Sequence, residues 1–217
     1  MPHNSQMMIA LLLLLTAYLL GSLSGSLLLG RCRGVDVRHH GSGNAGGTNA
    51  LRTLGWKFAL GVVLIDVGKG ALAVWLTMQF APPDAPVGVI ALAWVAALLV
   101  IAGHTWPVFY GFRGGKGAAT LLGALAVIWP SSLPWFLGCW LLIIGVSGYV
   151  GLATLLATFG LIVLAALAGD GVQLGFVVIT ALLIVYNHRD NLRRLRAGNE
   201  SRFERARVLR RPFRMRS

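Results

Sequence analysis

Seven long apolar segments constrain the fold of this chain more than any other feature. Each is long enough to cross much or all of a bilayer core of about 30 Å. Only 12% of the 217 residues are charged, about half the share of a soluble domain, and the mean hydropathy is +0.73. Backbone polar groups in lipid must be bonded within their own segment, so we expect helices. The expected fold is an all-α polytopic integral membrane protein with seven transmembrane helices: Met8–Leu29, Trp56–Phe80, Val87–Gly103, Ala118–Trp129, Trp135–Val150, Leu152–Ala168 and Gln173–Tyr186.

The basic residues predict which way the helices run. The first connection, residues 31–54, carries four arginines, residues 104–117 carry Arg113 and Lys116, and residues 188–217 carry eleven arginines, whereas the alternate connections carry no lysine or arginine. The positive-inside rule therefore predicts an outside amino terminus and a cytoplasmic carboxyl terminus, which agrees with seven crossings. We expect residues 1–200 to form a single membrane domain and residues 201–217 a basic cytoplasmic tail. Anionic membrane lipids, and no nucleic acid, are the expected partners near this tail.

A glycine-rich run at residues 40–49 lies in the first basic connection. Its glycines allow backbone N–H groups to converge on an anion, and Ser42, Asn44, Thr48 and Asn49 add hydrogen-bond donors. Arg38 and Arg52 flank the run with fixed charge. A flexible linker is the alternative interpretation, although linkers seldom combine these residue types.

Further polar groups occur in the predicted helices or connections near the face of the membrane that is predicted to be cytoplasmic. Asp66 and Lys69 share one helix face, where they form either a structural ion pair or a ligand contact. Lys116 lies among glycines just before an expected helix, and the spacing of a Walker A motif is missing. Thr154 follows an uncharged turn, and His188 follows the last expected helix.

Donors of this kind suit phosphate groups at the lipid boundary. The chain lacks the carboxylate clusters of a Mg²⁺-dependent transferase, so no metal is expected. Many glycerolipid acyltransferases use as a general base a histidine that is followed five positions later by an aspartate. None of the five histidines of this chain has an aspartate at that position.

Four motifs in order closely resemble the bacterial PlsY family of acyl-phosphate-dependent glycerol-3-phosphate acyltransferases. The resemblance covers residues from about 8 to 200. The motifs are Gly41-Ser42-Gly43-Asn44-x-Gly46-x-Thr48-Asn49, Asp66-x-x-Lys69-Gly70, Gly103-His104-x-x-Pro107-Val108-Phe109-x-x-Phe112-x-Gly114-Gly115-Lys116-Gly117-x-Ala119-Thr120 and His188-Arg189-x-Asn191.

The resemblance implies seven helices in a bacterial inner (plasma) membrane, with the active site on the cytoplasmic side. It also implies transfer of a fatty acyl group from acyl phosphate to the sn-1 hydroxyl of glycerol 3-phosphate, which is the first step of phospholipid synthesis. The products are lysophosphatidic acid and inorganic phosphate, and no cofactor is implied. The implied catalytic residues are Ser42, Lys116 and His188. The implied substrate-binding residues are Ser42, Gly43, Asn44, Thr48, Asn49, Arg52, Lys69, His104, Gly115, Lys116, Gly117, Thr154, His188 and Asn191.

Two positions depart from the family pattern. Gly47 replaces the usual alanine, and Thr154 stands where serine is common but keeps a hydroxyl. The expected proton acceptor is a substrate phosphate, together with Ser42 or His188.

Two other function classes are open. A membrane transporter of a phosphate ester or small anion would also use intramembrane Asp66 and Lys69, although the polar clusters gather on one face. A lipid phosphotransferase would be expected to carry more acidic residues for Mg²⁺.

Overall fold

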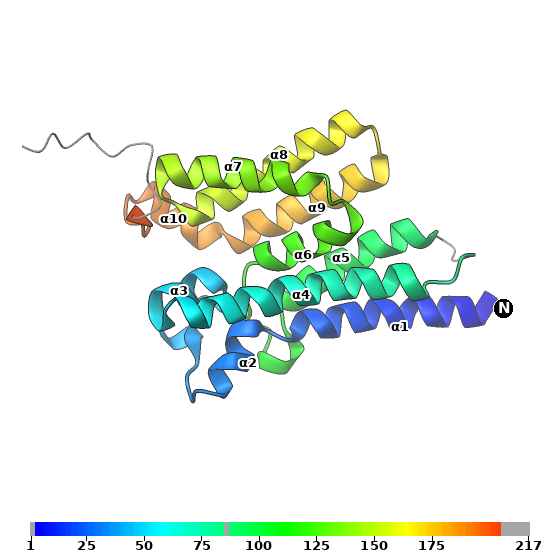
Figure 1. The fold of residues 1–217 in the computed structure, drawn as a ribbon, viewed down its shortest axis with the longest axis horizontal. Coiled ribbons are helices and arrows are strands. Elements are labelled where there is room, and N and C mark those ends of the chain that lie inside the picture. The colour runs from blue at the N-terminus through cyan, green and yellow to red at the C-terminus, as the bar shows by residue number, and fades with distance from the viewer. Residues whose placement is uncertain (1–2, 85–86, 205–217) are drawn as a thin grey trace, which may run out of the picture. The chain divides into compact units, whose positions relative to one another are not determined.

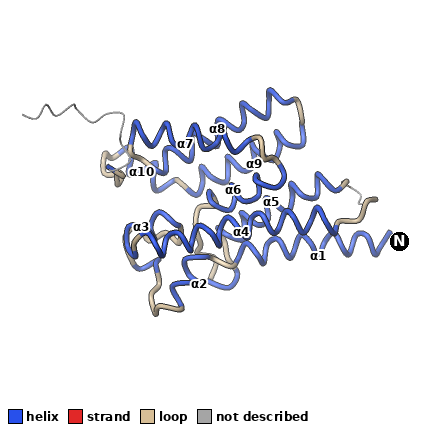
Figure 2. The backbone as a smooth tube through the Cα atoms, in the orientation of Figure 1, coloured by secondary structure: helices blue, strands red, loops and turns tan. Residues whose placement is uncertain are grey.

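The computed structural model describes residues 3–84 and 87–204, and every regular element within them is helical (Figure 2). This agrees with the all-α prediction. The elements are α1 (His3–Ser22), α2 (Gly25–Arg31), η1 (Val37–His39), α3 (Gly47–Leu54), α4 (Trp56–Phe80), α5 (Val89–Thr105), η2 (Val108–Tyr110), α6 (Ala118–Ile128), α7 (Ser132–Ser147), α8 (Val150–Ala168), α9 (Gly171–Asn187) and α10 (Arg189–Arg196).

The chain forms two compact units, with the boundary between Pro130 and Ser131. In the first unit α1 packs along α5, and α4 packs along α6 (Figure 1). In the second unit α8 packs against both α7 and α9. The prediction of one membrane domain over residues 1–200 stays a prediction, and most of the predicted tail, residues 205–217, lies outside the described residues.

Glycines allow the helices of the first unit to approach closely. A Cβ on Gly21 would overlap the Val100 carbonyl, and a Cβ on Gly123 would overlap the Val67 carbonyl. Small residues let helix backbones pack closely in membranes, where packing replaces the hydrophobic effect as the source of association. Gly21 therefore lets the end of α1 pack closely against α5.

Two predicted boundaries were wrong. The apolar segment Met8–Leu29 is two helices, because the chain breaks at residues 23–24 between α1 and α2. The connection 31–54 is not a plain loop, because it holds η1 and α3. The last three residues of the glycine-rich run, Gly47 to Asn49, already belong to α3.

Within residues 3–84 and 87–204, four helical segments are long and apolar enough to cross a membrane, and a fifth is added if α9 and α10, which meet at a 57° bend, count as one span. Helices α6 and α7 are shorter. At about 1.5 Å per residue, α6 extends only about 16 Å. An integral membrane protein is thus supported by the described residues, while the count of seven crossings stays a prediction.

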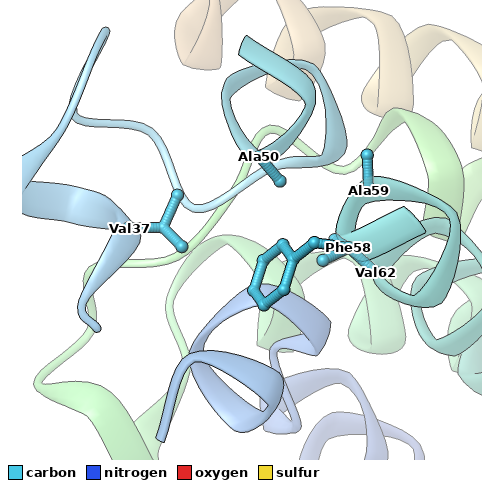
Figure 3. Packing of buried hydrophobic residues seen from close by; sticks show 5 residues of the cluster. All are labelled: Val37, Ala50, Phe58, Ala59 and Val62. Carbon is cyan, nitrogen blue, oxygen red and sulfur yellow. The ribbon is translucent and has the colours of Figure 1, made fainter. Parts of the chain in front are cut away.

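The connection 31–54 is anchored on α4 by a small apolar cluster (Figure 3). Val37 comes from η1, Ala50 from α3, and Phe58, Ala59 and Val62 from the first turns of α4. All five are buried, and burying apolar area contributes about 25 cal/mol per Å². The alternative interpretation of this connection as a flexible linker is therefore wrong.

Candidate functional site

Asn49 organises the glycine-rich run. Its Nδ2 atom lies 3.0 Å from the Val37 carbonyl oxygen, 2.9 Å from that of His40 and 3.0 Å from that of Asn44. Its Oδ1 atom accepts a hydrogen bond of 2.9 Å from the Ser42 backbone N–H. The Asn49 residue is only 1% exposed. The amide therefore folds the run into a closed turn and leaves the Ser42 residue exposed.

The segment between α5 and α6 forms the second polar loop. Pro107 accepts hydrogen bonds from the backbone N–H groups of Tyr110 and Phe112, and Gly114 donates to the Thr105 carbonyl. Phe112 has a φ of 59°, in the left-handed region, so this turn is tightly specified. The predicted helix Val87–Gly103 corresponds to α5, which ends at Thr105, two residues before Pro107.

Arg38 ties the two loops together. Its guanidinium pairs with the Asp36 carboxylate through two contacts, Nε to Oδ1 at 3.1 Å and Nη2 to Oδ2 at 2.8 Å. Its Nη1 donates to the carbonyl oxygens of Tyr110 at 2.9 Å and Arg113 at 3.2 Å. The hydrogen bonds from Arg38 hold the pKa of Asp36 below its ordinary value of 3.8. The sequence placed Arg38 beside the run but gave no sign of this link to the second loop.

Lys69 is held by four protein groups inside the first unit. Its Nζ atom lies 2.9 Å from Asp66 Oδ1, and 2.9 Å from His104 Nδ1. It also donates to the carbonyl oxygens of Gly21 and Leu23, each at 2.9 Å. These carbonyls lie where α1 ends, and carbonyls at the end of a helix have no N–H partner within it. The ammonium of Lys69 supplies the missing hydrogen-bond donors.

Asp66 completes this buried cluster. Its Oδ1 atom accepts a hydrogen bond of 3.1 Å from Gly25 N–H at the start of α2, and lies 3.4 Å from His104 Nδ1. The predicted pairing of Asp66 with Lys69 is confirmed. One carboxylate and one ammonium therefore contact both sides of the α1–α2 break, which gives the pair a structural role.

His104 connects that cluster to Lys116. Gly115 donates its backbone N–H to the His104 carbonyl at 3.1 Å. A Cβ on Gly115 would overlap the His104 ring at Nε2, so only glycine fits against this ring. The half-buried Lys116 follows directly, and α6 begins two residues later, as the sequence predicted.

In the second unit, Thr154 lies on α8, one turn after the helix begins. Its hydroxyl donates to the Val150 carbonyl at 3.0 Å and accepts a hydrogen bond of 3.2 Å from Trp140 Nε1. The connection before it is Gly148 and Tyr149, so it lies two to three residues earlier than Gly151, where the predicted helices meet. Trp140 is a neighbour of this site that the sequence did not identify.

His188 lies at the bend between α9 and α10 and is 4% exposed. Its Nδ1 atom lies 2.8 Å from the Ile184 carbonyl oxygen. A carbonyl only accepts, so Nδ1 carries the proton of this hydrogen bond. Asn191 donates to Glu200 Oε1 at 2.7 Å, and Arg194 donates to Glu200 Oε2 at 2.6 Å.

The structure thus places the predicted residues in two groups. In the first unit the two loops that carry them are joined by Arg38, and in the second the start of α8 lies against α10, where a Cβ on Gly151 would touch Asn191. The first group is Ser42, Gly43, Asn44, Thr48, Asn49, Arg52, Lys69, His104, Gly115, Lys116 and Gly117, and the second is Thr154, His188 and Asn191.

A metal centre is not evident in either group. Within residues 3–84 and 87–204, no three histidine, cysteine, aspartate or glutamate side chains gather as metal ligands would. The expectation that the reaction needs no metal is left to experiment.

Comparison with known proteins identifies one family. The family model for glycerol-3-phosphate acyltransferase matches residues 11–198. A glycerol-3-phosphate acyltransferase from Synechococcus sp. (strain CC9902) is 44% identical, covering 89% of this chain and 94% of the relative. One from Chlorobaculum tepidum is 37% identical, covering 90% and 97%.

Solved structures agree with this assignment. A crystal structure of PlsY, an integral membrane glycerol 3-phosphate acyltransferase, in its glycerol 3-phosphate form superposes with a TM-score of 0.83 at 36% identity, covering 93% of this chain and 99% of that one. The lysophosphatidic acid form of PlsY gives a TM-score of 0.81 at the same identity and coverage.

Proposed function

This chain belongs to the glycerol-3-phosphate acyltransferase family, and we propose that its acyl donor is a fatty acyl phosphate and its acceptor the sn-1 hydroxyl of glycerol 3-phosphate. The hydroxyl oxygen bonds to the acyl carbon, and the bond from that carbon to the phosphate oxygen breaks. Lysophosphatidic acid and inorganic phosphate leave. The observation that carries the proposal is the family match over residues 11–198, which contains both groups of polar residues.

The first task of such a site is to hold two phosphate groups close together. Each pair of unit charges about 6 Å apart repels by roughly 3 kcal/mol at an effective dielectric constant of 20. We assign the compensating positive charge to Arg52 and Lys116. Ser42 and the neighbouring backbone N–H groups of the glycine-rich run are assigned as hydrogen-bond donors to the phosphates. The exposure of Ser42 and Arg52 supports this assignment.

The second unit is proposed to contribute Thr154, His188 and Asn191 to the same reaction. A substrate phosphate is the proposed acceptor of the hydroxyl proton, together with Ser42 or with His188, whose Nδ1 atom donates to the Ile184 carbonyl. Phosphate is a stable leaving group, so its departure needs little acid assistance. Orientation of the hydroxyl against the acyl carbon supplies much of the remaining acceleration.

Three of the predicted substrate-binding residues are better explained as supports. The polar side-chain atoms of Asn49 and the Lys69 ammonium are engaged by protein groups, and His104 is packed between Lys69 and Gly115. We propose that these residues hold the loops that carry Ser42, Gly115 and Lys116. Direct contact of these three with substrate stays a prediction.

We also propose seven crossings of a bacterial inner membrane, with the amino terminus outside and the site on the cytoplasmic side. The arginine distribution of the sequence supports this orientation. The short helix α6 is compatible with it, because α6 packs along α4 and a helix enclosed by protein need not match the lipid thickness.

The direct test is an assay of purified protein with acyl phosphate, glycerol 3-phosphate and EDTA. We expect release of inorganic phosphate in equal amount to lysophosphatidic acid. Loss of activity in EDTA that Mg²⁺ restores would contradict the metal-free proposal. Activity only with another acyl donor would contradict the acyl phosphate proposal.

The transporter alternative is tested in sealed vesicles. Its main support was the buried pair Asp66–Lys69, and the structure shows both groups engaged at the α1–α2 break. We therefore expect no accumulation of glycerol 3-phosphate that is separable from ester formation. Accumulation without ester would support transport.

A further inference from the structure

A pocket lies in the first unit, apart from the residues assigned to the reaction. It has a volume of about 560 Å³, which is within the range of pockets that bind small molecules. Its walls come from α2, the connection to η1, and η2. Leu27, Arg31, Asp36, Arg38, Phe109 and Tyr110 line it, and none of these is among the predicted substrate-binding residues.

The charge of the pocket favours an anion. The Arg38 charge is compensated by Asp36, and its guanidinium is held by two backbone carbonyls. Arg38 therefore forms part of the pocket lining without adding net charge. Arg31 carries the uncompensated charge, because within the described part of the chain no carboxylate lies within 4.0 Å of it. The Arg31 guanidinium lies 5.7 Å from the centre of the Tyr110 ring, an arrangement that orients the cation along the pocket wall.

The position of the pocket favours a lipid. Arg31 ends α2, which follows the α1 span after the break, and Tyr110 ends the candidate span Val89–Tyr110. Arginine and tyrosine at the ends of membrane helices lie at the level of the lipid headgroups. The pocket is therefore expected at the boundary between lipid and water.

Apolar side chains beside the pocket strengthen this inference. Phe109 is 52% exposed, and Leu28, Val108 and Phe112 are also exposed around the same two elements. Exposed apolar residues next to an exposed arginine suit a molecule with a charged head and hydrocarbon chains. A small hydrophilic anion would use only the arginine.

We propose that this pocket binds the phosphate headgroup of an anionic phospholipid from the surrounding bilayer, with Arg31 contacting the phosphate and Phe109 the adjoining acyl chain. A lipid bound there would contact Arg38 and η2 and would stabilise the hydrogen bonds by which Arg38 links the two loops. The proposal rests on membrane insertion and not on the identity of the acyl donor, so a binding measurement tests it independently of the reaction.

The test uses the full-length protein, stripped of lipid in a neutral detergent and offered phosphatidylglycerol or phosphatidylcholine. Retained lipid is counted by native mass spectrometry. We expect retention of phosphatidylglycerol in preference to phosphatidylcholine. Arg31→Gln is expected to weaken this retention about tenfold, because one charge-assisted hydrogen bond is lost.

Arg33→Gln is the matched control. Arg33 is exposed two residues further on and carries the same charge, but it lies over the Phe58 ring and does not line the pocket. We expect this variant to retain phosphatidylglycerol like the wild type. Equal losses in both variants would show a general effect of surface charge and would overturn the proposal, as would equal retention of the two lipids.

Competition separates a lipid headgroup from a free phosphate. Inorganic phosphate at millimolar concentration is expected to leave the bound phosphatidylglycerol in place, because it lacks the acyl chain. Full displacement would mean that the pocket takes free anions, and would contradict the proposal. If Arg31→Gln does not fold, Phe109→Ser, at an exposed position, is expected to weaken retention of phosphatidylglycerol, and unchanged retention would contradict the proposal.

Discussion

The two units hold their polar side chains in place by different kinds of contact. In the first, side chains are held by partners distant in sequence: Arg38 by Tyr110, Lys69 by Gly21 and His104. In the second, Thr154 and His188 each bond to the carbonyl four residues earlier in the chain. The first arrangement makes loop position depend on contacts between residues far apart in sequence, whereas the second relies more on contacts within one turn of helix, supplemented by Trp140 at Thr154. Substitutions of support residues should therefore cost more stability in the first unit than in the second.

The largest expected effect is at Lys69. Lys69→Met leaves Asp66 buried without its counter-charge, and we expect a loss of about 3–5 kcal/mol in the free energy of unfolding. Denaturant unfolding in detergent measures it. Lys57→Met, at an exposed position on the same helix, is the control and should change stability by less than about 0.5 kcal/mol.

A second variant distinguishes charge from packing at this site. Removing both charges, in Asp66→Asn with Lys69→Met, should destabilise the protein less than Lys69→Met alone, because no buried charge is left unpaired. An equal or larger loss in the double variant would mean that the ion pair does not explain the stability of the α1–α2 break.

Arg38 should have the next largest effect. Arg38→Gln removes the pairing with Asp36 and the bonds to two carbonyls of the second loop, and we expect a loss of about 2 kcal/mol. Because the second loop carries Lys116, kcat/KM should also fall under conditions where the variant is folded. Arg33→Gln is the control, and an equal fall in that variant would show that Arg38 does not position the loop.

Thr154 tests the second unit, where we expect loss of activity at little cost in stability. Thr154→Val removes a hydroxyl bonded to Val150 and Trp140, and should cost about 1 kcal/mol of stability and about tenfold in kcat/KM. Thr154→Ser keeps the hydroxyl and should stay near wild type. Normal activity in the valine variant would remove Thr154 from the proposed site.

The smallest expected effect is the pH dependence of the Asp36–Arg38 pair. The pKa of Asp36 is lowered in the folded protein, so its contribution is complete above the ordinary pKa of 3.8 and is lost as the pH falls through the lower folded pKa. The difference in melting temperature between wild type and Asp36→Asn should therefore shrink between about pH 6 and about pH 3. A difference that grows toward acid would contradict the assignment.

The sequence predicted what depends on local patterns. Hydropathy located the long helices, and the spacing of Asp66 and Lys69 predicted their pairing because residues three apart share a helix face. The break between α1 and α2 was missed because its stabilising donor, Lys69, lies more than forty residues away. The link from Arg38 to Tyr110 joins residues 72 positions apart, and no local pattern predicts such a contact.

The candidate site residues also divide into those that local motifs located and those whose role depends on their partners in the fold. The motifs located Lys116 and His188, but the role of Asn49 as the centre of its turn depends on which carbonyls surround it. Glu200, which holds Asn191, lies outside the motifs that carried the resemblance.

The most direct test of the central claim is the rate of phosphate release from acyl phosphate in the presence of glycerol 3-phosphate, comparing Lys116→Ala with Arg113→Ala. Arg113 is an exposed cation three residues earlier in the same loop, and its backbone carbonyl accepts a hydrogen bond from Arg38. We predict a loss of about 10³-fold or more in kcat for Lys116→Ala in protein that is folded normally, and near-wild-type turnover for Arg113→Ala. Near-normal turnover in Lys116→Ala would contradict the account.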